Sequence, residues 1–197
     1  MAKKIKKLVS FFYEIGSLRR VLRAHQQSLF FRDESDNISS HSFRVAFIGY
    51  FLAKELKADE NKVIKMCLLH DIEETRSGDQ NWVNKKYVKV FEKEIVEDQL
   101  KGLPNSEELL NLLKEYYERK TLEAKIAKDA DLLDQLLLLK EYEFQGSKEA
   151  ARWLKGKKES NQEKLMSTKL AKEIAKEIKK QKPSLWWQNA WTHNRRK

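Results

Sequence analysis

The chain has 197 residues, and a formal net charge of +10 goes with only six glycines and two prolines. A single cysteine excludes an intramolecular disulfide and a cysteine-based zinc knuckle. No apolar run approaches the roughly 20 residues that span a bilayer. The length and the helix-favouring composition predict an all-α protein with one domain over residues 1–197, and we expect it to be cytoplasmic with no membrane contact.

The positive charge is concentrated near the C-terminus. Residues 155–197 hold 13 basic side chains against four acidic ones. Such a segment is typical of a solvated, lysine-rich helix. Nucleic-acid binding through this tail is the less favoured alternative.

Apolar spacing predicts helices along the whole chain. In chain order they cover residues 3–27 (as one or two helices), 41–57, 60–75, 84–101, 106–119, 121–142, 147–155 and 160–181. The polar segment 32–40 reads as a loop, and Ser39 or Ser40, Ser106 and Thr121 are the predicted caps. The end, 183–191, holds three tryptophans and is expected to dock on the body or on a second copy of the chain.

Two of these helices have a predicted buried face. In 41–57 it consists of Phe43, Ala46, Phe47, Tyr50, Phe51 and Leu52. In 60–75 the spacing i, i+3, i+7, i+11 puts Val63, Met66, His70 and Glu74 on one face. Glu73 is expected to face solvent, and Cys67 to be a small core residue.

His70 and Asp71 follow directly on an apolar stretch. Burying an imidazole and a carboxylate together without partners costs several kcal/mol, by order of magnitude. A divalent cation would compensate both groups, because neutral histidine and ionised aspartate are each good metal ligands. The pair therefore predicts part of a metal site.

Two further residues can complete that site. Asp131 interrupts an apolar stripe of its helix, and His41 begins a helix whose other residues are core. Asp134, on the same stripe as Asp131, is the rival ligand. The set His41, His70, Asp71 and Asp131 predicts one metal ion per chain, with Mn, Co, Fe, Ni or Zn favoured over Mg by the mixed nitrogen and oxygen ligands.

The pattern His41…His70-Asp71…Asp131 resembles the signature of the HD-domain metal-dependent phosphohydrolases. The segments Ser39–Ser42, His70–Glu74, Gly78-Asp79 and Ala127–Asp131 resemble the 5′-deoxynucleotidase branch more closely. The resemblance covers about residues 15–145, with 147–197 as a basic helical extension. It implies an all-α HD-domain helical bundle with a single-metal site in its core.

The resemblance also implies roles for residues around the metal. Glu74 and Asp79 would act at the reacting phosphate, Asp71 would share in catalysis, and Arg23 would bind phosphate. Arg76 and Arg44 are additional phosphate candidates. The chain departs from the branch in two places, because no aromatic residue follows Arg23 and Ser40 stands where the branch carries glutamate.

These residues predict a metal-dependent phosphomonoesterase acting on nucleoside 5′-monophosphates. One alternative is an HD hydrolase of another phosphoester, such as a cyclic nucleotide, a pyrophosphate or an alarmone. The other is a non-catalytic, metal-stabilised module that binds nucleic acid. A homo-oligomer, a dimer for example, is expected from the tryptophan-rich end and from the resemblance.

Overall fold

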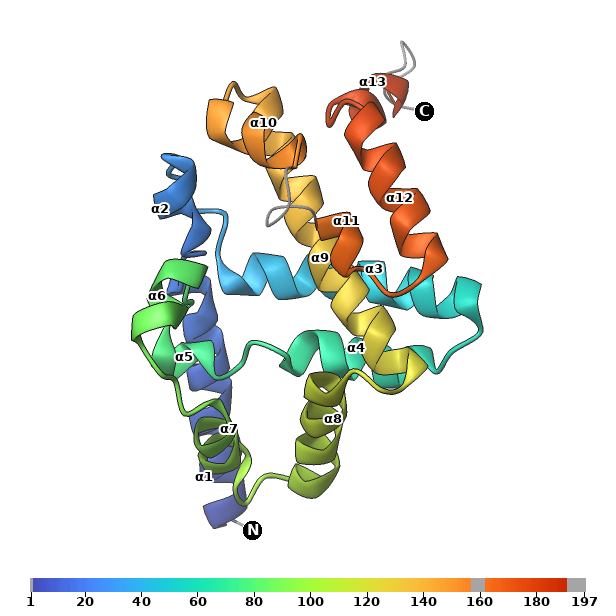
Figure 1. The fold of residues 1–197 in the computed structure, drawn as a ribbon. Helices are drawn as coiled ribbons and strands as arrows, with labels where there is room; N and C mark the ends of the chain where they lie inside the picture. Colours follow the sequence, from blue (N-terminus) through green and yellow to red (C-terminus); the bar gives the residue numbers. More distant parts are fainter. Residues whose placement is uncertain (1, 157–161, 191–197) are drawn as a thin grey trace, which may run out of the picture.

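The computed structural model describes residues 2–156 and 162–190 and is built from helices (Figure 1). Within these residues no strand forms, and a β-bridge joins Leu22 to Asn37. The all-α prediction is therefore confirmed. The elements are α1 Ala2–Gly16, the 3-10 helix η1 Ser17–Arg20, α2 His25–Leu29, α3 Ile38–Leu56, α4 Glu60–Leu69, α5 Glu74–Ser77, α6 Trp82–Tyr87, α7 Glu92–Leu100, α8 Ser106–Glu118, α9 Leu122–Phe144, α10 Lys148–Leu154, α11 Gln162–Leu165, α12 Lys169–Lys180 and α13 Leu185–Ala190.

Helix α9 runs through the middle of the molecule, where α3 and α4 cross it (Figure 1). It is buried around most of its circumference, as expected for a helix covered on several sides. Helix α12 adds Ala171 and Ala175 to the same hydrophobic cluster. The predicted C-terminal extension thus contributes to the core, and the one-domain organisation stays a prediction.

The predicted buried face of α3 is wrong for its three phenylalanines and correct for Leu52, which is buried. Phe43, Phe47 and Phe51 are 65%, 54% and 62% exposed. The buried face instead carries Ile38, His41, Ser42, Val45, Gly49, Leu52 and Ala53. Several of these side chains are small, so α3 lies close to its neighbours and brings a polar histidine inside.

Gly49 is where α3 comes closest to α4. A Cβ atom at this position would lie 2.7 Å from Cys67 Sγ and 3.0 Å from Val63 Cγ1, and both residues are fully buried. We expect Gly49→Ala to lower the free energy of unfolding by about 1–2 kcal/mol, because overpacking outweighs the gain in helix propensity. Chemical denaturation measures this change. Gly16→Ala is the control, since no atom lies within 4 Å of its added Cβ, and an equal loss there would contradict the packing argument.

The predicted helix over 60–75 breaks at His70. Helix α4 ends at Leu69, His70 is its C-cap residue, and α5 begins at Glu74. His70 Nδ1 lies 2.8 Å from the carbonyl oxygen of Cys67, so the imidazole takes up a backbone acceptor at the helix end. His70 and Asp71 therefore sit in a turn, and the shared helical face predicted for His70 and Glu74 does not exist.

Two other predicted helices are also divided. The one over 84–101 separates into α6 and α7 at Val88–Phe91, where two β-branched valines weaken helix propensity. The one over 160–181 contains α11 and α12, and its first two residues lie outside the described residues. Buried Asp129 accepts the backbone N–H groups of Ser167 and Thr168 at this second break. Asp129 thus anchors α12 and points away from the predicted metal site.

The predicted caps differ in outcome. Thr121 accepts the N–H of Ala124 at the start of α9, as predicted. Helix α3 is capped by Asn37 instead of Ser39 or Ser40, and α8 begins after Asn105 without a side-chain cap. The sequence placed these two caps within a few residues of the observed helix starts.

The tryptophan-rich end forms α13, and Trp191 lies outside the described residues. Trp186 is 75% exposed and Trp187 is 47% exposed, so their docking on a partner stays a prediction. Among the described helices, none combines the length and the apolar character needed to cross a membrane.

Candidate metal centre and its cleft

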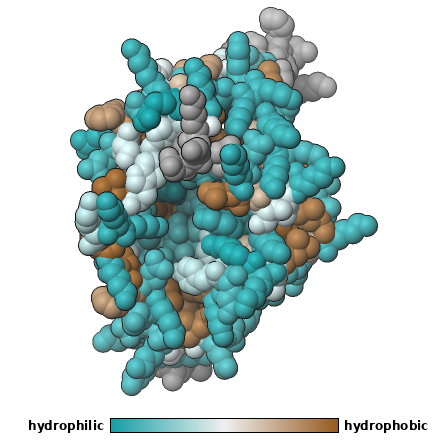
Figure 2. Space-filling view, in the orientation of Figure 1, coloured by the Kyte–Doolittle hydropathy of each residue, from teal (hydrophilic) through white to brown (hydrophobic). Residues whose placement is uncertain are grey.

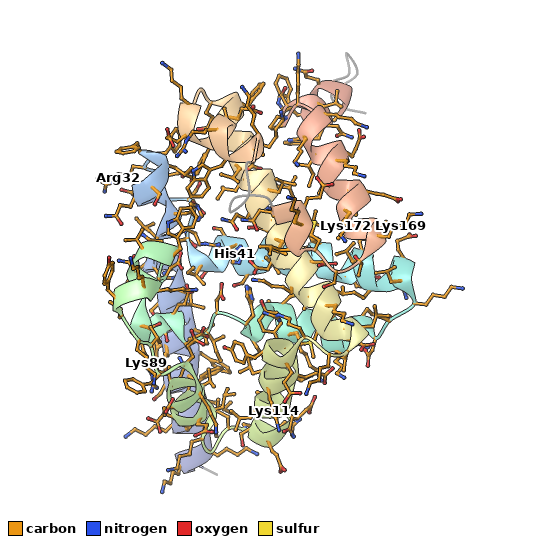
Figure 3. The ribbon with its side chains drawn as sticks, viewed as in Figure 1. Arg32, His41, Lys89, Lys114, Lys169 and Lys172 are labelled. Carbon is orange, nitrogen blue, oxygen red and sulfur yellow. The ribbon has the colours of Figure 1, made fainter. Side chains whose placement is uncertain are left out.

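Three elements bring the predicted metal ligands together. His41 lies in the first turns of α3, next to α9 in the middle of the molecule (Figure 3). His70 and Asp71 lie in the turn after α4, and Asp131 lies on α9. The sequence positions these groups through the Asn37 cap of α3 and the break at His70.

The ligand atoms of His41, His70 and Asp71 cluster closely, and Asp131 joins them beside His41. His41 Nε2 lies 3.2 Å from His70 Nε2, 3.5 Å from Asp71 Oδ2 and 3.3 Å from Asp131 Oδ1. His70 Nε2 lies 3.2 Å from Asp71 Oδ2. The atoms of His41, His70 and Asp71 all lie within 4.8 Å of one another, and the other oxygen of Asp131 is 2.6 Å from Lys128 Nζ.

Hydrogen bonds to the Nδ1 atoms of His41 and His70 leave the Nε2 atom of each ring free to act as a metal ligand. His70 Nδ1 must carry a proton, because its partner is the Cys67 carbonyl oxygen, which only accepts. His41 Nδ1 lies 2.6 Å from Asp134 Oδ2 and donates to it. Two neutral rings would therefore point lone pairs at each other across 3.2 Å, an arrangement that a cation between them makes favourable.

The electrostatics favour positive charge at the same point. Burial and Arg23 lower the pKa of His41, but the carboxylates of Asp131, Asp134 and Asp71 outweigh them and raise it to about 10. Burial would raise the pKa of Asp71, yet the two histidines hold it well below its usual range. These carboxylates leave an excess of negative charge at this position. Either a proton on His41 or a bound metal ion would neutralise part of it.

Asp134 is the residue behind His41. Its second oxygen accepts from Arg44 Nε, and Arg44 Nη1 donates to Glu141 at 2.7 Å. Burial would raise the pKa of Asp134, but His41 and Arg44 lower it, so the carboxylate stays ionised. Asp134 is therefore placed to hold the His41 tautomer, and Arg44 is engaged with carboxylates instead of facing the cleft.

We expect Asp134→Asn to weaken metal binding about 10- to 100-fold, because the amide no longer fixes Nδ1–H and leaves His41 less basic. Metal titration of chelator-treated protein by calorimetry measures this change. Asp33→Asn serves as a control on the neighbouring loop. Unchanged metal affinity in Asp134→Asn would show that Asp134 does not support His41.

Two adjacent carboxylates line the cleft beside the ligands. Glu74 Oε2 and Glu73 Oε2 are both buried without a hydrogen-bond partner. Burial and the charge of Asp71 raise the pKa of Glu74 to about 10 and that of Glu73 to about 8. Glu74 lines the same cleft as His70, Asp71 and Asp131, whereas the prediction that Glu73 faces solvent is wrong, since it is 7% exposed.

A buried polar cluster connects the segment that holds Arg23 and His25 to Asp36 and to Tyr142 on α9. The N–H of Arg23 donates to the carbonyl oxygen of Asp36. The Asp36 carboxylate lies 2.9 Å from His25 Nε2 and accepts the Tyr142 hydroxyl at 2.8 Å. The His25 side chain therefore has a polar partner in Asp36.

Arg23 and Asp79 meet at the edge of the ligand cluster. Arg23 Nε is buried without a hydrogen-bond partner and lies 3.6 Å from Asp79 Oδ2. The same oxygen accepts the N–H of Ala24 at 2.7 Å, so Asp79 holds the Arg23 segment. Arg76 instead forms a salt bridge with Glu14 at 2.6 Å and does not line the cleft, so we leave it out of the proposed site.

The cleft has a volume of about 940 Å³ and reaches from the ligand cluster to α6, α8 and α11. Figure 2 shows that this face is mostly hydrophilic and is hollowed near its centre. Its walls include residues that the sequence did not single out, among them Trp82, Trp153, Tyr116, Tyr117, Lys85 and Lys86. No motif marks these side chains, because they come from three helices, α6, α8 and α10, that meet only in the fold.

Comparisons with known proteins agree with this arrangement. A family model for the HD domain matches residues 15–178. The 5′-deoxynucleotidase HDDC2 of Dictyostelium discoideum is 33% identical over 122 residues, which cover 56% of this chain and 64% of that protein. HDDC2 of Xenopus laevis is 29% identical over 146 residues, which cover 70% of each chain. The chain thus spans about two thirds of the length of these curated relatives.

Similarity extends to solved structures. A conserved hypothetical protein from Pyrococcus furiosus is 29% identical and superposes with a TM-score of 0.71. The superposition covers 88% of this chain and 99% of that one. The fold is therefore shared over nearly the whole length of both chains.

Proposed function

This chain belongs to the HD-domain family of metal-dependent phosphohydrolases, and from that premise we propose that its substrates are nucleoside 5′-monophosphates. The observation that carries the proposal is the cluster of His41, His70 and Asp71, with Asp131 beside His41, in a molecule that also buries an arginine nitrogen without a hydrogen-bond partner. The similarity to 5′-deoxynucleotidases at 29–33% identity supports the nucleotide as substrate.

His41, His70, Asp71 and Asp131 would hold one divalent cation. Their mixed nitrogen and oxygen donors fit Mn, Co, Fe, Ni or Zn better than Mg. When bound, such a cation polarises a phosphate oxygen and lowers the pKa of a coordinated water. The protein's contribution is to fix His41 through Asp134, His70 through the Cys67 carbonyl and Asp131 through Lys128.

The chain's own residues then bind phosphate and move a proton. Arg23 is a buried cation with a free donor, suited to the charge that develops on the phosphoryl oxygens. As water attacks phosphorus and the bond from phosphorus to the sugar oxygen breaks, protonated Glu74 can donate its proton to that leaving oxygen. Asp79 acts through Arg23, whose segment it holds in place.

The proposal is tested by phosphate release from protein stripped with a chelator and restored with each metal in turn. The panel contains deoxy- and ribonucleoside 5′-monophosphates, 3′-monophosphates, a cyclic nucleotide and pyrophosphate. We expect release only after metal is restored, with 5′-monophosphates as the best substrates. Preferred cleavage of another panel member would establish a different phosphoester, and no release with any metal would support the non-catalytic alternative.

The remaining expectations belong to the same proposal. A homo-oligomer and a cytoplasmic location stay predictions, as does weak or absent nucleic-acid binding by the basic tail. Size measurement by light scattering checks the first of these.

A further inference from the structure

Trp82 is an exposed aromatic side chain on the wall of the cleft that holds the metal ligands. It is the first residue of α6, it is 56% exposed, and it lines the same cavity as His70, Asp71 and Asp131. Covering such a ring with a planar ligand would be favourable, because it removes apolar area from water. This ring therefore offers a surface for an apolar, planar group.

Trp82 is held in place from two sides. Its ring centroid lies 4.7 Å from that of Trp153, which is buried on α10. Asn81 caps α6 and also donates to the carbonyl oxygen of Ala24 and to Gln27. Because Ala24 directly follows Arg23, the ring is tied to the segment that carries the proposed phosphate-binding arginine.

Positive charge lies next to this ring. Lys85 and Lys86 follow on the same helix and line the cleft, and neither forms an ion pair with a described residue. Lys89 lies just beyond α6 at the same side of the molecule (Figure 3). A fixed aromatic face beside cations is the combination that proteins use to bind a nucleobase together with its phosphates.

We propose that Trp82 is the stacking surface for the base of a nucleoside phosphate whose phosphate is held at Arg23 and the metal ligands. This inference rests on the proposed function and names the part of the site that recognises the base. The cleft of about 940 Å³ has room for base and sugar beyond the reacting phosphate.

The experiment compares a substrate that has a base with one that lacks it. Hydrolysis of deoxyadenosine 5′-phosphate and of deoxyribose 5-phosphate is measured for wild type, Trp82→Ala and Trp82→Phe. In Trp82→Ala the ratio of the two kcat/KM values should fall about 5- to 100-fold, chiefly through KM, because base stacking on an aromatic ring is lost. Trp82→Phe should restore most of that ratio.

Trp186→Ala is the matched control, because Trp186 is also exposed but does not line this cleft. Its ratio should equal that of wild type. An equal loss on both substrates in Trp82→Ala, or no loss on either, would overturn the proposal. A melting temperature for each variant separates a loss of the fold from a loss of stacking.

Binding of the nucleotide gives a readout that does not depend on turnover. Calorimetric titration of deoxyadenosine 5′-phosphate should show weaker binding to Trp82→Ala than to wild type by the same factor. If wild type hydrolyses neither compound, the proposed function fails while this titration still decides the role of Trp82. Equal affinity of both proteins for the nucleotide would then refute the stacking role by itself.

Discussion

Asp71→Ala should abolish both metal binding and phosphate release. Asp71 Oδ2 lies within 3.5 Å of both imidazole nitrogens that face the proposed metal position, so its loss removes a ligand and a charge together. Metal assistance supplies several kcal/mol of transition-state stabilisation, which corresponds to a loss of about 1000-fold or more in turnover. Metal content after dialysis and the rate of phosphate release are the two measurements.

Asp71→Asn is a second variant that keeps the size of the side chain. It separates loss of the ligand charge from loss of the fold. Asp98→Ala is the control, because this exposed carboxylate on α7 does not line the cleft. The control should keep full metal content and rate. If Asp71→Ala retained stoichiometric metal and normal turnover, the proposed ligand set would be wrong.

Glu74→Gln should lower kcat about 100- to 10,000-fold on nucleoside monophosphates, the range expected for loss of a general acid. In the folded protein, burial and Asp71 raise the pKa of Glu74 to about 10, so its carboxyl group is protonated at neutral pH. A bound cation would lower that pKa, because positive charge favours the carboxylate. Wild-type kcat should therefore fall as pH rises through the pKa of Glu74 in the complex, and Glu74→Gln should lack this alkaline limb.

The leaving group separates proton donation from a structural role of Glu74. A nitrophenyl phosphate releases an oxygen that needs little protonation, so the variant should lose far less rate on it than on a nucleotide. Equal losses on both substrates would contradict proton donation by Glu74. Glu73→Gln is the matched neighbour, and if it alone removed the alkaline limb, the proton donor would be Glu73.

Much of the metal site could be predicted from the sequence because its residues conflict with their surroundings. His70-Asp71 ends an apolar stretch, and Asp131 lies within an apolar stripe. Burying such groups is unfavourable without a partner, so the conflict itself predicts a ligand. The structure gathers His70 and Asp71 with His41 and puts Asp131 beside His41, while their role as ligands stays a proposal.

The buried faces of the helices and the positions where they break were harder to predict from the sequence than the metal site. The largest apolar residues of α3, Phe43, Phe47 and Phe51, stay exposed, whereas Gly49 and Ala53 face the core. Hydrophobicity ranks side chains by their preference for burial, but close packing of two helices selects small ones. The break at His70 depends on a side-chain bond to the Cys67 carbonyl, which apolar spacing does not reveal.

The sequence by itself determined the helical class and the four residues proposed to bind metal, because local periodicity and misplaced polar groups are properties of the chain alone. Tertiary structure decided which groups surround them. It pairs Arg76 with Glu14, buries Glu73, sets Asp134 beside His41 and packs Trp82 against Trp153. Each of these contacts joins residues whose distance in space depends on how the helices pack, and no short stretch of sequence encodes that distance.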